Sequence, residues 1–224
     1  HFKGVDAVSG IKSFALEPAG ASFSVGPIKE LVWNVMPTGV DFGPDGYLYF
    51  SDWVEGWPQS ERGRIYRMHV PEAHGTPEVR ETQRVLAEGM DHRSERALRG
   101  LLGHPDMRVR QEAQFEFADR GRSVIPILLQ VATRGTARFA RIHALWGLGQ
   151  MTARLGPERV SLRALYPLLA DSDAEVRAQT AKVLGGGYRP ADTARRLEPL
   201  LSDPSARVRF QAAMSLGRLA RRES

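Results

Sequence analysis

The sequence predicts a mixed, multidomain fold, in which the last blade or so of an antiparallel β-propeller is followed by an all-α solenoid. Residues 1–70 alternate short apolar runs with turns rich in Gly and Pro, which is typical of strands joined by tight connections. From about residue 93 one helical motif returns at a nearly constant interval, which is typical of stacked helical hairpins. We therefore expect propeller strands at 1–75, a connecting helix and linker at 76–92, and about four helical hairpins at 93–224.

Four copies of one motif make up the second half. Three begin with a Leu pair, LLGHPDMRVRQEAQFEFA at 101–118, LLADSDAEVRAQTAKVLG at 168–185 and LLSDPSARVRFQAAMSLG at 200–217, and a weaker copy, ARFARIHALWGLG, lies at 137–149. Each contains a Val-Arg or Ala-Arg pair whose first residue we take as the anchor, position 0. The intervals between anchors are 31, 36 and 32 residues. This period predicts a solenoid, because one hairpin cannot bury its apolar stripe alone. The anchors are Val109, Ala140, Val176 and Val208.

The columns of the repeat predict which residues form its core. Positions 0, +4 and +8 share one helical face and are apolar or small in each copy, so they form a single stripe. We expect Leu184 and Leu216, both at +8, to be buried between hairpins. Position −3 is Asp or Ser in three copies, where a short oxygen-bearing side chain can cap the helix start. Position +1 is always arginine, and we expect a structural ladder made of Arg110, Arg141, Arg177 and Arg209.

Together these columns resemble HEAT repeats, in which an Asp or Ser opens the second helix of each pair and Val-Arg, small residues and Leu follow. The resemblance covers about residues 94–220. It implies a rigid, curved surface that binds a protein partner and has no catalysis of its own. The pattern also predicts the bounds of helices. These are 79–87, one that opens at Arg93 or Ser94 and ends at 103–105, and then 124–132, 136–151, 158–169, 173–184, 191–201 and 205–221.

Positions +2 and +6 predict where a partner docks. They point away from the apolar stripe, so an isolated solenoid should carry polar residues there. Five of the eight are large and apolar instead, and exposed apolar patches often mark interaction sites. The alternatives are that the superhelix turns some of them inward or that the propeller covers them. The expected docking residues are Phe115, Ile142, Trp146, Phe210 and Met214.

The pattern of the first 75 residues predicts six short antiparallel strands. They are expected at 11–16, 22–25, 30–35, 38–42, 47–52 and 64–69. The segment Gly43-Pro44-Asp45-Gly46 supplies the preset φ of proline and the left-handed position of glycine that a tight hairpin needs. Six strands without a helix suit about one and a half propeller blades.

The strings PTGVDFGPDGYLYFSDWVEGW at 37–57 and GRIYRMHV at 63–70 resemble blade strands of the NHL and glucose/sorbosone-dehydrogenase β-propellers. With HPDMRVRQEAQFE at 104–116, they are similar to the membrane-bound dehydrogenase family of planctomycete-type bacteria, in which such a propeller runs into HEAT-like repeats. The resemblance implies that this chain is the C-terminal part of a larger, exported or periplasmic protein. That parent would be a quinone-dependent sugar or alcohol dehydrogenase, with a quinone and Ca²⁺ as its cofactors.

Few residues of the strand region suggest a site. Asp52 ends a predicted strand and is the one candidate we single out for binding a cofactor on a propeller axis. Trp53 and Trp57 can stack on a sugar or simply pack. The densest acidic group has the oxygen ligands that Ca²⁺ prefers, although the turn explains Asp45 as well; its members are Asp41, Asp45, Asp52 and Glu55.

The sequence lacks the motifs of several kinds of catalytic and metal site. There is no Cys, which excludes a CxxCH haem site and disulfides within the chain. The six His show no metal-binding spacing, and no GxSxG, Walker or dinucleotide motif is present. We therefore expect no catalytic residue, no metal site and no cofactor within this chain alone.

The charge is unevenly distributed along the sequence. Residues 1–75 carry six Lys or Arg and nine Asp or Glu, whereas the remainder carries 25 and 17. A basic half can bind nucleic acid, and a DNA-binding scaffold would need its arginines on the concave face. Only four of the 31 basic residues are Lys, and many arginines occupy structural columns, so a nucleic-acid partner is not expected. The expected partner is a protein or the chain's own upstream propeller, and no apolar run is long enough to span a membrane.

Overall fold

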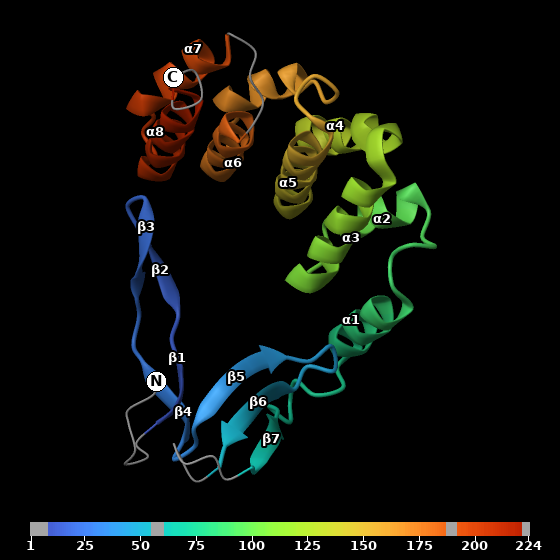
Figure 1. The fold of residues 1–224 in the computed structure, drawn as a ribbon, viewed down its shortest axis with the longest axis vertical. Helices are drawn as coiled ribbons and strands as arrows, with labels where there is room; N and C mark the ends of the chain where they lie inside the picture. The colour runs from blue at the N-terminus through green and yellow to red at the C-terminus, as the bar shows by residue number, and fades with distance from the viewer. Residues whose placement is uncertain (1–8, 55–60, 187–191, 221–224) are drawn as a thin grey trace. The chain divides into compact units, whose positions relative to one another are not determined.

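The computed structural model describes residues 9–54, 61–186 and 192–220. The chain divides into two compact units, one made of residues 1–19 and 23–88, the other of residues 20–22 and 89–224. In the described part of the chain, the first unit holds the strands and one helix, and the second holds the remaining helices (Figure 1).

The strands form three small sheets. The sheet pairs are β1 with β4, antiparallel, and β2 with β3, and the third sheet has the order β5-β6-β7. The predicted strand 11–16 is therefore divided between two sheets, because Phe14 and Ala15 separate β1 from β2. The described residues show antiparallel strands but no closed propeller. The bounds are β1 Gly10–Ser13, β2 Leu16–Ala19, β3 Ser22–Val25, β4 Lys29–Trp33, β5 Pro37–Phe42, β6 Leu48–Trp53 and β7 Gly63–Met68.

The sheet β5-β6-β7 is an antiparallel meander centred on β6. Phe50 of β6 is buried and lies opposite Val40 of β5 and Tyr66 of β7. The predicted turn joins β5 to β6: the Gly46 amide donates to the Gly43 carbonyl over 3.0 Å, and Gly46 has a φ of 81°. Only glycine adopts that φ at little cost, so this turn fixes the register of the hairpin.

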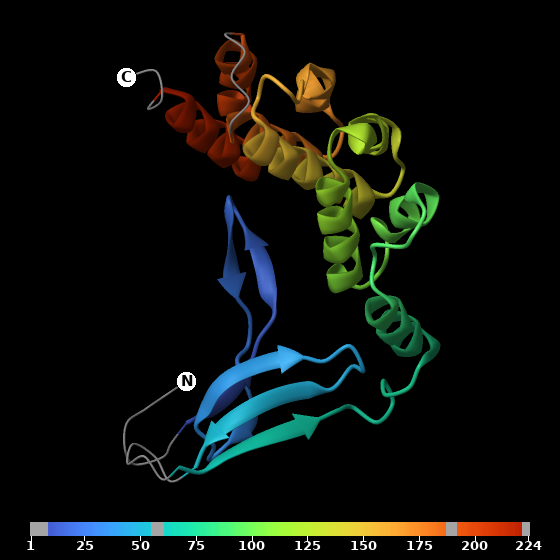
Figure 2. The same ribbon diagram turned by 45° about the vertical axis from the view of Figure 1, so that its right-hand side comes forward.

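The helical unit has two layers (Figures 1 and 2). Helices α3, α5, α6 and α8 pack side by side in chain order, and α2, α4, η2 and η3 each pack on one of them to form the second layer. The bounds are α1 Pro77–Glu88, in the strand unit, then α2 Glu95–Leu101, α3 Met107–Arg120, η1 Gly121–Val124, α4 Ile125–Arg134, α5 Arg138–Leu155, η2 Arg163–Ala170, α6 Ala174–Gly185, α7 Thr193–Leu197, η3 Glu198–Ser202 and α8 Ala206–Ala220.

The apolar stripe of the repeat forms the core between the layers. All four residues at position 0 and all four at +4 are buried. At +8, Leu184 is fully buried as predicted, whereas Leu216 is only half-buried. The prediction for Leu216 was wrong because α8 is the last helix of the described chain, so no further described helix packs beyond it. The caps follow the −3 column: Asp106 accepts the Arg108 amide at 2.8 Å, and Asp173 accepts the Glu175 amide at 2.8 Å.

Small residues allow α6 and α8 to pack closely. A Cβ atom at Gly185 would overlap the side chain of Ser215, so only glycine fits there. The Ser215 hydroxyl donates to the Ala181 carbonyl over 2.9 Å. This contact joins the third and fourth copies tightly.

One predicted helix, 158–169, is wrong in its first part and in the type of helix. Residues 158–162 are not helical, and the 3₁₀-helix η2 begins only at Arg163. Gly156, with a φ of 94°, ends α5, and Pro167 inside η2 lacks the N–H that a longer α-helix requires. Positions 191 and 221, which bound two other predicted helices, lie outside the described residues.

Candidate functional site

The layer formed by α3, α5, α6 and α8 carries the predicted docking residues. Phe210 and Met214 lie one turn apart on α8 and are 47% and 44% exposed. Phe115 on α3 and Trp146 on α5 are half-buried. Ile142 is buried, with 5% exposed, so its assignment to an accessible surface was wrong. α5 is packed against both α3 and α6, and Ile142 is covered there, whereas Phe210 and Met214 on α8 are exposed.

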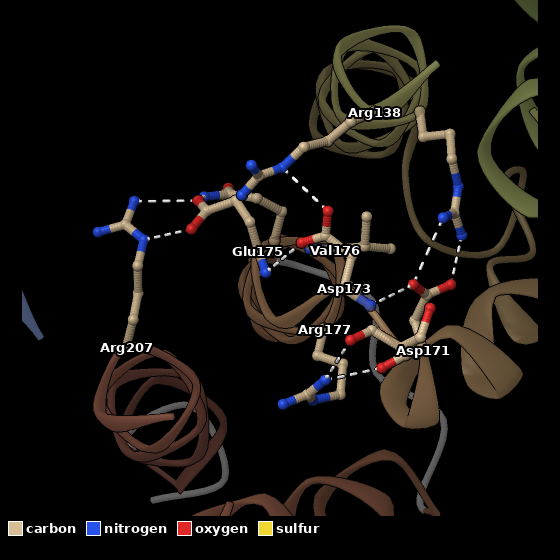
Figure 3. Close-up of polar contacts among 10 residues, drawn as sticks. Arg138, Asp171, Asp173, Glu175, Val176, Arg177 and Arg207 are labelled. Carbon is tan, nitrogen blue, oxygen red and sulfur yellow. Dashed lines mark hydrogen bonds and ion pairs between the residues drawn. The ribbon is translucent and has the colours of Figure 1, made fainter. Parts of the chain in front are cut away.

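Trp146 is held in place by a chain of polar contacts. Its indole N–H donates to Gln179 Oε1 over 2.8 Å, and Gln179 Nε2 donates to Glu175 Oε1 over 2.6 Å. Glu175 also accepts two hydrogen bonds from Arg207, of 2.6 and 3.1 Å (Figure 3). The contacts connect α5, α6 and α8, so they fix the orientation of the indole on this layer.

A shallow pocket of about 210 Å³ lies beside Trp146. Its lining comes from the C-terminal halves of α5 and α6, from the residue that follows α6, and from α8. One side is aromatic, the floor is formed by small residues, and two basic side chains complete it. The lining residues are Trp146, Gly149, Thr152, Ala153, Lys182, Val183, Gly186 and Arg218.

The arginines at position +1 hold the loop that precedes each of their helices. Nη1 of Arg110 donates to the carbonyls of His104 and Pro105 over 2.6 and 2.7 Å, and Arg177 and Arg209 repeat this contact with the equivalent loops. Arg141 donates instead from Nε to the Ala132 carbonyl over 3.0 Å. Arg141 thus satisfies a carbonyl in the last turn of α4, where a helix leaves carbonyls without intrahelical partners, and the other three satisfy carbonyls of the loops.

Two of these arginines also connect one copy of the repeat to the next. Arg141 forms a two-point ion pair with Asp171, and Arg177 forms one with Asp203 through hydrogen bonds of 2.8 and 2.9 Å (Figure 3 shows Asp171 and Arg177). The side chains in both pairs are largely buried. Two-point pairing of this kind is geometrically specific, so it fixes the angle between neighbouring hairpins.

The acidic partners form a column that the sequence reasoning missed. Asp171 and Asp203 both stand at position −5, and each also accepts the amide of the −3 residue, over 2.9 and 2.8 Å. In the first copy His104 occupies this position and accepts the Asp106 amide through Nδ1. The signal was present in the aligned strings, where a polar residue follows LLG, LLA and LLS.

The ladder is interrupted between the first and second copies. Position −5 of the second copy is Gly135, which has no side chain to offer. Arg110 instead donates from Nε to His143 Nε2 over 3.2 Å, and its guanidinium lies 4.5 Å from the centre of the Phe139 ring. This junction therefore depends on a histidine and an aromatic ring in place of a carboxylate.

His143 is buried and neutral in this arrangement. Because arginine can only donate, Nε2 of His143 must accept, so Nδ1 carries the proton and donates to Gln114 Oε1 over 2.8 Å. Burial and the positive charge of Arg110 lower the pKa of His143 to about 4. Protonation would place a second positive charge against a largely buried guanidinium.

The carboxylates of the ladder are held in the ionised form. The hydrogen bonds from Arg177 lower the pKa of Asp203. Burial alone would raise the pKa of Asp171, but the hydrogen bonds from Arg141 and the Asp173 amide outweigh it, so the pKa is lowered. These two carboxylates therefore have structural partners.

In the strand unit, the predicted acidic group is not gathered around a common point. Asp52 is largely buried, and its Oδ1 accepts the Met36 amide over 2.8 Å. Asp41 accepts the amide of Phe42, and Asp45 accepts the Tyr47 amide and the Tyr49 hydroxyl. Glu55 and Trp57 lie outside the described residues. Across residues 9–54, 61–186 and 192–220 no three His, Asp or Glu side chains are arranged to hold a metal ion.

The two-layer packing and the constant period define the helical unit as an α-solenoid. Residues 162–224, which span the third and fourth copies, match the sequence model of HEAT repeats. No curated protein matches the chain. None of the helices in the described ranges is long and apolar enough to cross a membrane.

Proposed function

We propose that the helical unit is a non-catalytic scaffold that binds a protein partner on the layer formed by α3, α5, α6 and α8. The observation that carries the proposal is the exposure of Phe210 and Met214 on adjacent turns of α8. Large apolar side chains at about half exposure lose contact with water when a partner covers them. The HEAT-repeat match at 162–224 supports the same role, since it includes both residues.

The ladder favours a binding surface with a fixed shape. The pairs Arg141–Asp171 and Arg177–Asp203 bridge consecutive copies, so the docking residues of α5 and α8 are presented in one arrangement. A preorganised surface loses less conformational freedom on binding. The arginine ladder thus serves binding by positioning, without contact with the partner.

The strand unit, in this proposal, is the end of a β-propeller that belongs to a larger parent protein. Val40 and Phe42 on one face of the sheet β5-β6-β7, and Ile65 on the other, are more than half exposed, and further sheets packed on the two faces would bury them. The alternative function, a part of a quinone-dependent dehydrogenase of the parent, rests on the resemblance and on Asp52. The hydrogen bond from Met36 to Asp52 favours a structural role for that carboxylate.

Site-specific photocrosslinking tests the scaffold proposal. A photoreactive phenylalanine analogue at position 210 should yield discrete protein adducts in a lysate of the source cells. The same analogue at Leu201, which is exposed to a similar degree on η3, is the control and should yield none of them. The double variant Phe210→Ser, Met214→Ser should reduce partner capture at least about tenfold, which corresponds to about 1.4 kcal/mol.

A second double variant controls for surface hydrophobicity. Val70→Ser with Leu201→Ser removes two exposed apolar side chains, one in the strand unit and one on η3, and it should leave capture unchanged. Both double variants should melt at the temperature of the unmodified chain. Equal adducts from positions 210 and 201, or equal loss of capture in both double variants, would overturn the assignment of the docking surface.

A further inference from the structure

The pocket beside Trp146 combines an apolar surface with uncompensated positive charge. Lys182 and Arg218 are both exposed on its rim. Neither is joined to a carboxylate by an ion pair in the part of the chain that the structure describes, and the lining residues include no Asp or Glu. The Lys182 ammonium lies 5.9 Å from the centre of the Trp146 ring.

The surrounding charges on this layer are already neutralised, which sets these two apart. Glu175 is engaged by Arg207 and Gln179, and Asp173 by Arg138 (Figure 3). Asp203 is engaged by Arg177. Because those carboxylates have their partners, the pocket keeps two net positive charges. An anionic group that enters it would meet both.

The apolar part of the pocket has room for a side chain. Gly149 lacks a Cβ, and a Cβ placed there would lie 3.5 Å from the Val183 methyl groups, an ordinary contact. Ala153 is also small, and the indole of Trp146 is held at the edge by its hydrogen bond to Gln179. An apolar side chain can therefore lie on the indole over this floor.

Arg218 extends the pocket into the docking surface. It follows Phe210 and Met214 at intervals of four residues along α8, so the three share one face of the helix. A bound chain that places a carboxylate near Arg218 would have its neighbouring residues directed along two exposed apolar side chains. This surface therefore favours a bound chain that carries acidic and apolar groups at adjacent positions.

We infer that this surface, whose role rests on the proposed scaffold function, takes an acidic and apolar peptide segment of a partner protein. A carboxylate of the segment lies between Lys182 and Arg218, an adjacent apolar side chain packs on Trp146 over Gly149, and the segment continues along Met214 and Phe210. Charge complementarity selects the partner and speeds its association, and the apolar contacts hold it. Nucleic acid fits less well, since the pocket offers one aromatic ring and no continuous basic groove.

Fluorescence anisotropy with defined peptides tests the inference on the complete 224-residue chain. The probe is a fluorescein-labelled peptide of twelve residues that alternates Leu and Asp, and its control replaces every Asp with Asn. The Asp peptide should bind at least about tenfold more tightly than the Asn peptide. Its affinity should fall as salt is raised from 50 to 500 mM, because exposed charges are screened.

Two double variants test whether binding depends on the charges of this pocket or on the overall positive charge of the chain. Lys182→Gln with Arg218→Gln should weaken binding of the Asp peptide at least about tenfold and abolish its advantage over the Asn peptide. Arg122→Gln with Arg195→Gln removes two exposed arginines elsewhere and should change the affinity less than about threefold, as distant screened charges do. All four side chains are exposed, so both variants should keep the original melting temperature.

Several results would overturn the inference. These are equal affinity for the Asp and Asn peptides, absence of binding to either, or equal weakening by the two double variants. Tighter binding of a 20-base-pair DNA duplex, lost in the Lys182/Arg218 variant, would assign the pocket to nucleic acid. Crosslinks from position 210 that persist without any preference for acidic peptides would remove this inference alone, whereas loss of those crosslinks removes the scaffold proposal itself.

Discussion

At the scale of single residues, the junctions between hairpins differ in the chemistry that holds them. Arg141 and Arg177 meet carboxylates that are ionised at neutral pH. Arg110 meets a neutral imidazole, because Gly135 leaves the acidic position empty. The first junction therefore responds to acid in a pH range where the other two do not.

We predict a pH-dependent loss of stability that originates at His143. Its pKa is about 4 in the folded chain and 6.5 without the fold, so the unfolded chain binds more protons between these values. The free energy of unfolding should therefore fall as pH is lowered from 6.5 to 4, by on the order of 2–3 kcal/mol. The ladder carboxylates, whose pKa values are lowered, lose their contribution only at still lower pH.

Urea unfolding followed by circular dichroism at intervals from pH 7.5 to 4.5 measures this effect. His143→Gln keeps a donor and an acceptor between Arg110 and Gln114 but cannot be protonated, so its unfolding free energy should be flatter over this range. A control variant, His92→Gln, alters an exposed side chain and should keep the slope of the unmodified chain. A slope unchanged by His143→Gln would contradict the assignment.

At the scale of elements, the sequence predicts which residues share one face of a helix, but not which other helices pack against that face. Val176, Thr180 and Leu184 recur on one face at helical spacing, so their burial follows from the sequence. The same helical spacing placed Ile142 on the outward face, because the spacing carries no information about the helices that pack on either side of α5. Asp171 and Asp203 escaped notice for a related reason, since their partners come from the preceding copy of the repeat.

The two leucines at position +8 give a quantitative prediction for the elements. Leu184 is fully buried between hairpins, so Leu184→Ala should destabilise the helical unit by about 2–5 kcal/mol. Leu216 is half-buried, and Leu216→Ala should cost clearly less. Denaturant unfolding of both variants measures the difference. Equal losses would mean that α8 is as well covered as α6.

At the scale of the whole molecule, the two units differ in how completely they bury their apolar residues. The four copies of the repeat bury every residue at position 0 and at +4. The strands leave Leu16, Phe23, Val25, Phe42 and Ile65 about half exposed or more. The order of strands and helices was predictable from sequence, whereas the separation of the strands into three small sheets depends on pairing between distant segments, which local patterns do not encode.

The difference in burial predicts that the helical unit folds on its own and that the strand unit does not. Residues 89–224 expressed alone should be soluble, helical by circular dichroism and cooperative in melting. Residues 1–88 alone should aggregate, because strand edges and apolar side chains are open to other chains. Size-exclusion chromatography and thermal melts of both segments measure this. A monomeric, cooperatively melting 1–88 segment would contradict the prediction.

The position of the ladder has a consequence for how such an array changes length during evolution. Each ion pair takes its arginine from one copy and its aspartate from the next, and Asp171 and Asp203 are one period apart. Loss of residues 171–202 would bring Asp203 to the place of Asp171, where Arg141 would meet an equivalent carboxylate. Duplication of the same segment would likewise supply both halves of every new junction. A gain or loss of any other length would leave an arginine without its carboxylate, so the chemistry of the junctions favours changes by whole copies.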